Sequence, residues 1–106
     1  LDYAMSYIES RTYGKNRISY NLFQKGINKD LVEKAYLTLD EEKEENVEDV
    51  KLEKLIEKKG KKVNVNNERD EKKIKEEQKL IQYLARQGFS LDKIFKKLKE
   101  YKGNYE

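Results

Sequence analysis

Hydrophobic residues recur at intervals of three and four along most of this chain, the spacing that places side chains on one face of an α-helix. Six stretches show the pattern, and polar or charged residues fill the positions between them. By residue number these stretches are 3–8, 18–23, 31–39, 47–56, 74–85 and 94–101. The sequence therefore predicts an all-α fold built from six helices.

Residues that favour the ends of helices lie between these stretches. Gly26 and Gly88 each follow a hydrophobic stripe, and glycine readily adopts the left-handed backbone conformation that ends a helix. Asn28, Asn67 and Ser90 are the expected N-caps, because a short polar side chain can accept a hydrogen bond from a free backbone N–H.

The two glycine corners repeat at a constant offset. Residues 22–32 align with residues 84–94 without a gap, so that Gly26 corresponds to Gly88. In each copy one large hydrophobic residue (Ile27 or Phe89) follows the glycine, and a capping residue, a spacer and an aspartate follow in turn. Matched corners of this kind favour helix-turn-helix-like units in tandem.

We therefore expect two three-helix units, residues 1–45 and 46–106. They should form an elongated array, because each unit in such an array touches mainly its neighbour. The third helix could continue through the acidic stretch that follows it and join the units. Residues 61–67 (KKVNVNN) are the expected flexible connection.

Composition narrows the range of functions. Charged residues make up 42% of the 106 residues and hydrophobic ones 36%, and the chain has no Cys and no His. A thiol nucleophile, a Cys or His zinc site, a Ser–His dyad and a disulfide framework are thereby excluded. The glycines are isolated, so there is no phosphate-binding loop. We expect no catalytic residue, no metal and no cofactor, and hence no enzyme.

The sequence also bears on the cellular location and the oligomeric state of the chain. No hydrophobic run approaches the roughly 20 residues that span a bilayer, and no signal-peptide pattern opens the chain. We expect a cytoplasmic monomer without a membrane partner. Because the chain begins at Leu1 rather than Met, we expect it to be a fragment of a longer protein.

Charges of opposite sign are segregated along the chain, although the net charge is only +3. Residues 10–29 hold five basic residues and no acidic one, residues 40–49 hold seven acidic residues against Lys43, and residues 93–102 hold five lysines against Glu100. Such segregation suits a surface that meets charged partners, although a need for solubility would also explain it.

The basic segments supply the candidate binding residues. The first set has no carboxylate nearby in sequence to compete for it: Arg11, Lys15, Arg17 and Lys25. The second set lies near the end of the chain: Arg86, Lys93, Lys96 and Lys97. Any single member could instead be a solvated surface charge.

Seven of the eight tyrosines fall into two groups. Five lie on or beside hydrophobic stripes and are expected in the core: Tyr3, Tyr7, Tyr36, Tyr83 and Tyr101. Tyr13 and Tyr20 lie within the first basic segment, where they could stack on a base or on a partner's side chain.

Three motifs, in order, resemble the RecX family. Residues 2–11 (DYAMSYIESR) resemble that family's aspartate, aromatic-alanine, aromatic-aliphatic and arginine pattern, with a shorter gap after the aspartate. Gly14-Lys15-Asn16-Arg17-Ile18 followed by Leu22 and Lys25-Gly26-Ile27 resembles its second repeat. Residues 83–90 (YLARQGFS), with Ile94 and Leu98, resemble its third.

The resemblance implies a function that could not be inferred from amino-acid composition alone. RecX-type proteins are three-helix repeats in series that lie along the groove of a RecA filament on single-stranded DNA. They inhibit filament growth or promote disassembly, and thereby lower ATP hydrolysis, strand exchange and RecA-stimulated repressor cleavage in DNA repair and the SOS response. The resemblance also implies that an earlier, N-terminal repeat is missing here, and it assigns no role to residues 40–49 or 61–67.

Two other functions remain open. A glycine corner within three helices also describes DNA-binding helix-turn-helix domains, although Asp30 and Asp92 would lie close to phosphates in such a complex. The chain could also be a helical scaffold without a nucleic-acid partner.

Overall fold

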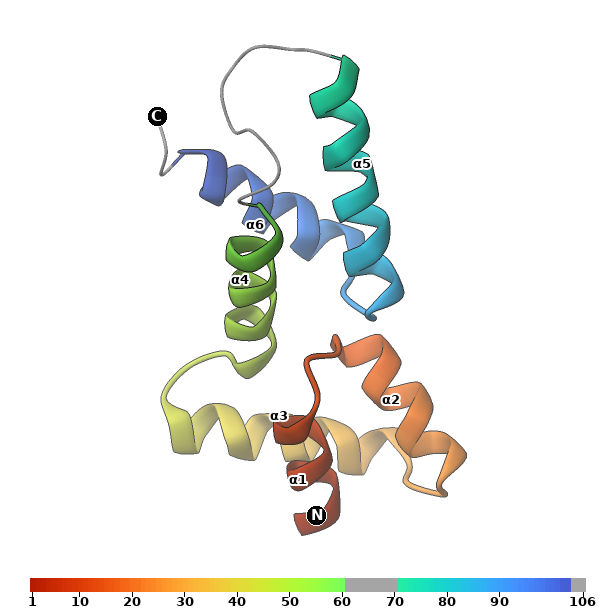
Figure 1. Ribbon diagram of the computed structural model, residues 1–106. Helices are drawn as coiled ribbons and strands as arrows, with labels where there is room; N and C mark the ends of the chain where they lie inside the picture. The colour runs from red at the N-terminus through yellow and green to blue at the C-terminus, as the bar shows by residue number, and fades with distance from the viewer. Residues whose placement is uncertain (61–70, 104–106) are drawn as a thin grey trace.

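Six α-helices and no strand make up the described part of the chain, residues 1–60 and 71–103 of a computed structural model (Figure 1). The helices are α1 (Asp2–Ser10), α2 (Lys15–Gln24), α3 (Lys29–Lys43), α4 (Val47–Gly60), α5 (Glu71–Arg86) and α6 (Leu91–Gly103). The prediction of an all-α fold is confirmed. The expected connection at 61–67, and with it the Asn67 cap, lies outside the described residues.

The helices bury their hydrophobic stripes in two separate clusters. Ile8 of α1, Leu22 of α2 and Leu39 of α3 are completely buried in the first cluster. Leu52 of α4 and Leu84 of α5 are completely buried in the second, to which α6 also contributes. The described part of the chain thus has two small cores, which is consistent with its low hydrophobic content.

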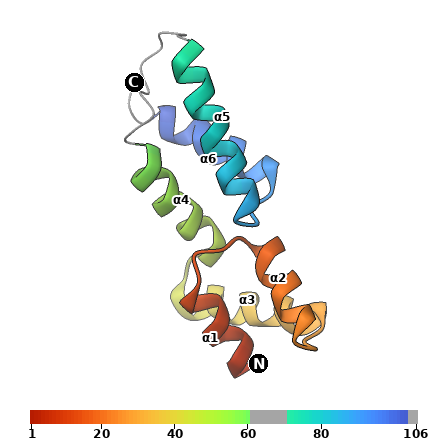
Figure 2. The same ribbon diagram turned by 45° about the vertical axis from the view of Figure 1, so that its right-hand side comes forward.

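The two three-helix groups lie end to end (Figure 2). The molecule measures 46 × 28 × 20 Å, and its radius of gyration is 15.3 Å, against about 13 Å for a compact domain of this length. The expected elongated shape is therefore present. Val47, the first residue of α4, packs in the first cluster, so the division between residues 45 and 46 stays a prediction.

The two glycine corners have the same backbone geometry. Gly26 and Gly88 have φ angles of 86° and 103°, the left-handed conformation expected of them. The N–H of Ile27 donates to the carbonyl of Leu22 at 3.0 Å, and that of Phe89 donates to the carbonyl of Leu84 at 3.3 Å.

The N-caps after the corners also match. Asn28 Oδ1 accepts a hydrogen bond from the N–H of Leu31 at 2.9 Å, and Ser90 Oγ accepts one from the N–H of Lys93 at 3.4 Å. Every matching pair of atoms is separated by 62 residues, so the predicted repeat of the corner is confirmed.

The third helix does not continue through the acidic stretch. It ends at Lys43, and Glu44 adopts a left-handed conformation with φ 52°. Asp40 Oδ1 accepts a hydrogen bond from the N–H of Val47, and Asn46 Oδ1 accepts one from the N–H of Asp49. Two side-chain caps thus start a new helix here. The prediction that the third helix could continue through the acidic stretch is therefore wrong.

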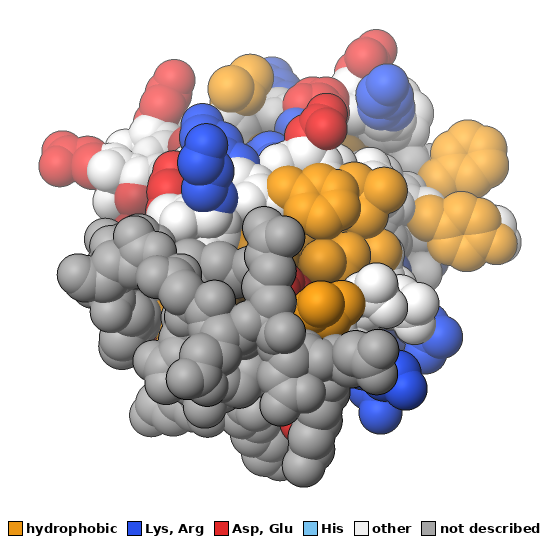
Figure 3. All heavy atoms as spheres, turned by 90° about the horizontal axis from the view of Figure 1, so that it is seen from above, with side chains coloured by type: hydrophobic (Ala, Val, Ile, Leu, Met, Phe, Trp, Pro, Cys, Tyr) orange, Lys and Arg blue, Asp and Glu red, His pale blue; other side chains and the backbone are white. Residues whose placement is uncertain are grey.

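Several stripe residues are more exposed than expected. Tyr36 is buried and Tyr7, Tyr83 and Tyr101 pack partly against the cores, but Tyr3 is 53% exposed. Phe23, Phe95 and Ile74 also lie at the surface. Seen from above, hydrophobic side chains gather in a patch at the surface (Figure 3). The hydrophobic stripes of the helices are therefore wider than the helix faces that pack in the two cores.

Candidate functional site at the junction of the two units

The loop before α2 and the corner between α5 and α6 meet through their backbones. The N–H of Gly14 donates to the carbonyl of Gln87 at 2.6 Å, and the N–H of Asn16 donates to the carbonyl of Gly88 at 3.0 Å. A Cβ on Gly14 would lie 2.3 Å from the Gly88 carbonyl carbon, and a Cβ on Gly88 would lie 2.5 Å from the backbone nitrogen of Arg17. Only glycine permits this approach.

A buried carboxylate joins the same elements. Glu48, in the first turn of α4, is 5% exposed. Its Oε2 accepts a hydrogen bond from the backbone N–H of Lys15 at 2.5 Å, and its Oε1 accepts one from Lys93 Nζ at 2.6 Å. Because Gly14 has no side chain to cap α2, Glu48 supplies the acceptor from another helix.

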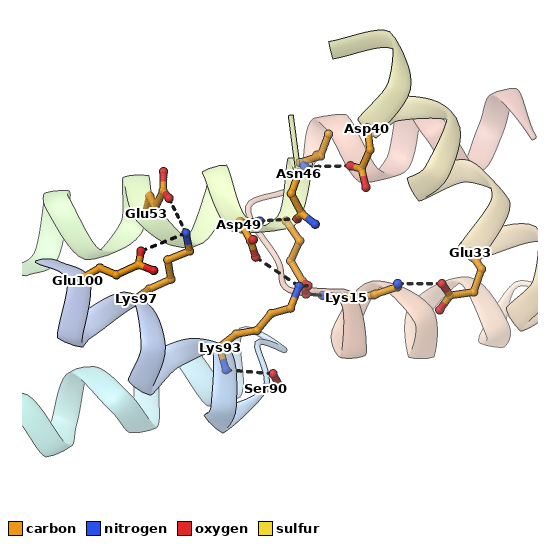
Figure 4. Close-up of polar contacts among 12 residues, drawn as sticks. Lys15, Glu33, Asp40, Asn46, Asp49, Glu53, Ser90, Lys93, Lys97 and Glu100 are labelled. Carbon is orange, nitrogen blue, oxygen red and sulfur yellow. Dashed lines mark hydrogen bonds and ion pairs between the residues drawn. The ribbon is translucent and has the colours of Figure 1, made fainter. Parts of the chain in front are cut away.

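Lys93 reaches this carboxylate from α6. Its Nζ also lies 3.3 Å from Asp49 Oδ1 (Figure 4). Burial opposes the charge of the amine, but the hydrogen bond and charge of Glu48, with those of Asp49, outweigh burial and raise the pKa of Lys93 above its ordinary value. The contact thus links α2, α4 and α6.

A second lysine crosses the junction on the side of α1. Lys51 Nζ donates a hydrogen bond to the backbone carbonyl of Ile8. Burial lowers the pKa of Lys51 to about 8, although the nearby charges of Glu48 and Glu9 oppose that shift. Lys51 is therefore a partly desolvated cation held between the two units.

Comparison with known proteins identifies the first unit. A family model of the second three-helix domain of RecX matches residues 1–35, which include α1, α2 and the start of α3. Residues 1–35 are thus similar to a RecX domain. No curated protein and no solved structure matches the chain closely enough to add to this. The assignment of residues 83–98 to a third RecX repeat stays a prediction.

Within the RecX-type first unit, most of the nominated basic residues already have partners. Lys15 Nζ lies 2.8 Å from Glu33 Oε2, so a carboxylate that is distant in sequence does compete for it. The Arg17 guanidinium lies 3.9 Å from the Tyr13 ring centroid and donates to Gln87 Oε1 at 3.2 Å. Arg17 therefore helps to join the RecX unit to the α5–α6 corner.

Lys25 and Arg11 are the exposed members of the first set. Lys25 Nζ donates to the Tyr3 hydroxyl at 2.9 Å, a hydrogen bond that raises the pKa of Lys25. The Arg11 guanidinium lies 4.9 Å from the Tyr7 ring centroid and remains exposed. Tyr20, nominated for stacking, is 63% exposed, whereas Tyr13 is covered by Arg17.

The second set divides in the same way. Lys93 is held by Glu48, and Lys97 Nζ lies between Glu53 and Glu100, 2.7 and 3.4 Å from their carboxylate oxygens. Arg86 and Lys96 are exposed and form no ion pair with a described residue. Lys15, Arg17 and Lys93 thus lie at the junction, where they help to hold the first unit against its neighbour. The role of the eight nominated residues in binding stays a prediction.

Sequence reasoning missed the residues that make the junction. Glu48 lies in a stretch that looked like solvated acidic surface, and Lys51 lies on a helix with many other lysines. Asn46, placed before Val47 and three residues before Asp49, was a capping signal that could have located the start of α4.

None of the described helices is both long and apolar enough to cross a membrane.

Proposed function

We propose that this chain regulates the RecA recombinase by binding its filament on single-stranded DNA and inhibiting ATP hydrolysis, strand exchange and repressor cleavage. The observation that carries the proposal is the RecX three-helix domain at residues 1–35. The expected activity is non-enzymatic, because the chain has neither Cys nor His and RecX-type proteins act by binding. The site of action is then the cytoplasm, where RecA and DNA are found.

The shape and rigidity of the molecule support this mode of binding. A filament groove offers acidic side chains and DNA phosphates over a long path, and a rod 46 Å long can meet several of them at once. The junction fixes one unit against the other through Glu48 and the Gly14–Gly88 contact. Binding therefore loses less conformational freedom than it would with two units on a flexible linker.

The exposed basic residues are the better contact candidates. Arg11 on the first unit, and Arg86 and Lys96 on the second, are free to meet carboxylates or phosphates. The nominated residues that already have partners would act mainly by maintaining the surface that carries these exposed cations. They are Lys15, Arg17, Lys93 and Lys97. Lys25 is also exposed, and its contact with Tyr3 leaves it accessible.

Direct, non-specific DNA binding is the second candidate function. The net charge of +3 and the helix–glycine–helix corners favour it. Asp30 and Asp92 are exposed in the first turns of the helices that follow the corners. Their charge would repel phosphates beside a recognition helix, which argues against sequence-specific binding.

Co-sedimentation tests the proposal. RecA filaments assembled on single-stranded DNA with a non-hydrolysable ATP analogue are pelleted with the chain, beside RecA alone and DNA alone. We expect more of the chain to pellet with the filament than with RecA alone or with DNA alone. Failure to pellet with filaments would contradict the proposal, and equal retention on bare DNA would favour the DNA-binding module.

A further inference from the structure

A groove lined largely by basic side chains runs along the junction, on the side of α1 and α4. It encloses about 510 Å³. Its basic lining residues come from the loop after α1, the end of α3 and the length of α4: Arg11, Lys43, Lys51, Lys54, Lys58 and Lys59. Among the residues that the structure describes, two acidic ones, Glu9 and Glu45, share this lining. We call this the junction groove.

The cations of the junction groove differ from those on the α6 side of the junction. Lys93 and Lys97 are neutralised by carboxylates, whereas Lys43, Lys54 and Lys58 are exposed and form no ion pair with a described residue. Cations that remain unpaired in a concave wall attract an anion more strongly than the same cations on an open surface. The charge of the junction groove is therefore complementary to an anionic ligand.

The spacing of the cations indicates a chain of charges rather than one small anion. Lys51, Lys54 and Lys58 lie three and four residues apart on one face of α4. At 1.5 Å of rise per residue they extend over roughly 10 Å. Successive phosphates of a nucleic-acid strand recur at intervals of a few ångström, so one strand would place several of them along this face.

An aromatic ring lies in the same wall. Tyr83 of α5 lines the junction groove, and Lys59 Nζ lies 4.3 Å from its ring centroid. Sites for single strands combine a positive groove that follows the backbone with an aromatic surface for the bases. An acidic polypeptide could use the same lysines, but it lacks the row of bases that such sites stack.

We propose that the junction groove binds the phosphodiester backbone of single-stranded nucleic acid directly. The proposal does not depend on RecA, and Arg11 is the only nominated residue that takes part in it. In a complex on DNA, the groove would hold a strand while other surfaces contact protein.

Fluorescence anisotropy with a labelled oligothymidylate, without RecA, tests this proposal. The groove variant is Lys54→Gln with Lys58→Gln, because both side chains are exposed and their loss should leave the fold intact. The control variant is Lys34→Gln with Lys99→Gln, which removes the same charge from exposed positions outside the groove. Circular dichroism checks that both variants are folded.

We expect the groove variant to bind about tenfold more weakly at low salt, with the control near the unaltered chain. The slope of log affinity against log salt should fall by about 1.4, since each lost phosphate contact on a single strand removes about 0.7. Equal losses in both variants, or none in either, would overturn the proposal. So would binding to polyglutamate that depends on Lys54 and Lys58 when binding to the oligonucleotide does not.

Discussion

The carboxylate of Glu48 on α4 lies 2.6 Å from the Nζ of Lys93 on α6 and, through its other oxygen, 2.5 Å from the backbone N–H of Lys15 on α2. One buried side chain thereby joins the RecX-type unit to the unit that follows it. Its neighbours in the contact include the backbones of Gly14 and Gly88. The relative placement of the two units is thus set by a few specific contacts.

Replacing Glu48 should destabilise the chain more than replacing an exposed partner of a similar lysine. Glu48→Ala leaves the Lys15 N–H without its acceptor and removes the closer counter-ion of Lys93, which should cost about 1–3 kcal/mol. We place the cost in the lower part of that range, because the Lys93 side chain is 38% exposed and keeps Asp49. Urea unfolding measures the difference.

Glu53→Ala is the matched control. Glu53 pairs with Lys97, but its side chain is 50% exposed, so its loss should cost less than about 1 kcal/mol. Equal costs for Glu48→Ala and Glu53→Ala would mean that the junction contact contributes no more than a surface ion pair.

Three glycine substitutions separate backbone strain from close packing. Gly26→Ala meets no atom within 4 Å but keeps a φ of 86°, so it should cost about 1 kcal/mol. Gly14→Ala has an ordinary φ of −75° but collides with Gly88. Gly88→Ala combines a positive φ with a steric collision, so it should lower the free energy of unfolding the most.

Thermal unfolding and small-angle scattering would measure these effects together. Alanine at Gly14 or Gly88 should increase the radius of gyration, because the units must separate to admit the new Cβ. Alanine at Gly26 should leave the radius unchanged. A Gly14→Ala variant with the stability and radius of the original chain would show that the backbone contact at the junction is absent.

Lys51 predicts a dependence of stability on pH. Its pKa is about 8 in the folded chain and 10.5 ordinarily. Between these values the unfolded state binds more protons, so the free energy of unfolding should rise as the pH is raised through this window. Below pH 8 both states are protonated, and the contribution of Lys51 is constant.

The Lys51→Met variant should lose this rise. The comparison uses urea unfolding at pH 7 and at pH 9.5, below the range in which the raised pKa of Tyr36 affects stability. If both chains show the same change between these pH values, Lys51 keeps an ordinary pKa and is not desolvated at the junction.

Charge reversal should separate binding from folding. Arg11→Glu, Arg86→Glu and Lys96→Glu together alter only exposed cations, so the unfolding midpoint should change little while filament binding weakens by about tenfold or more. Reversal of Arg17 should lower stability as well, because Arg17 contacts Tyr13 and Gln87. Normal filament binding by the triple variant would exclude these three residues as contacts.

The sequence predicted local features well because their causes are local. The corners at Gly26 and Gly88 follow from the preference of glycine for a positive φ, and the Asn28 cap follows from the reach of one short side chain. Periodic hydrophobic residues predicted all six helices. The end of α3 was missed because Glu44, which is not glycine, adopts the left-handed conformation there.

The junction could not be predicted because its partners are distant in sequence. Gly14 and Gly88 are separated by 74 positions, and nothing near either one indicates the other. Lys15 had no sequence neighbour of opposite charge, yet Glu33 and Glu48 both reach it in space. Charge patterns showed which residues could bind, but only the fold shows which of them are already engaged.

The most direct test of the proposed function is the DNA-dependent ATPase of RecA on single-stranded DNA, titrated with this chain at low and moderate salt. We predict inhibition at less than one chain per RecA subunit, because a chain bound in the filament groove affects more than one subunit. The Gly14→Ala variant, with its units separated, should inhibit less. Full ATPase activity at an excess of folded chain would contradict the assignment of this chain as a RecA regulator.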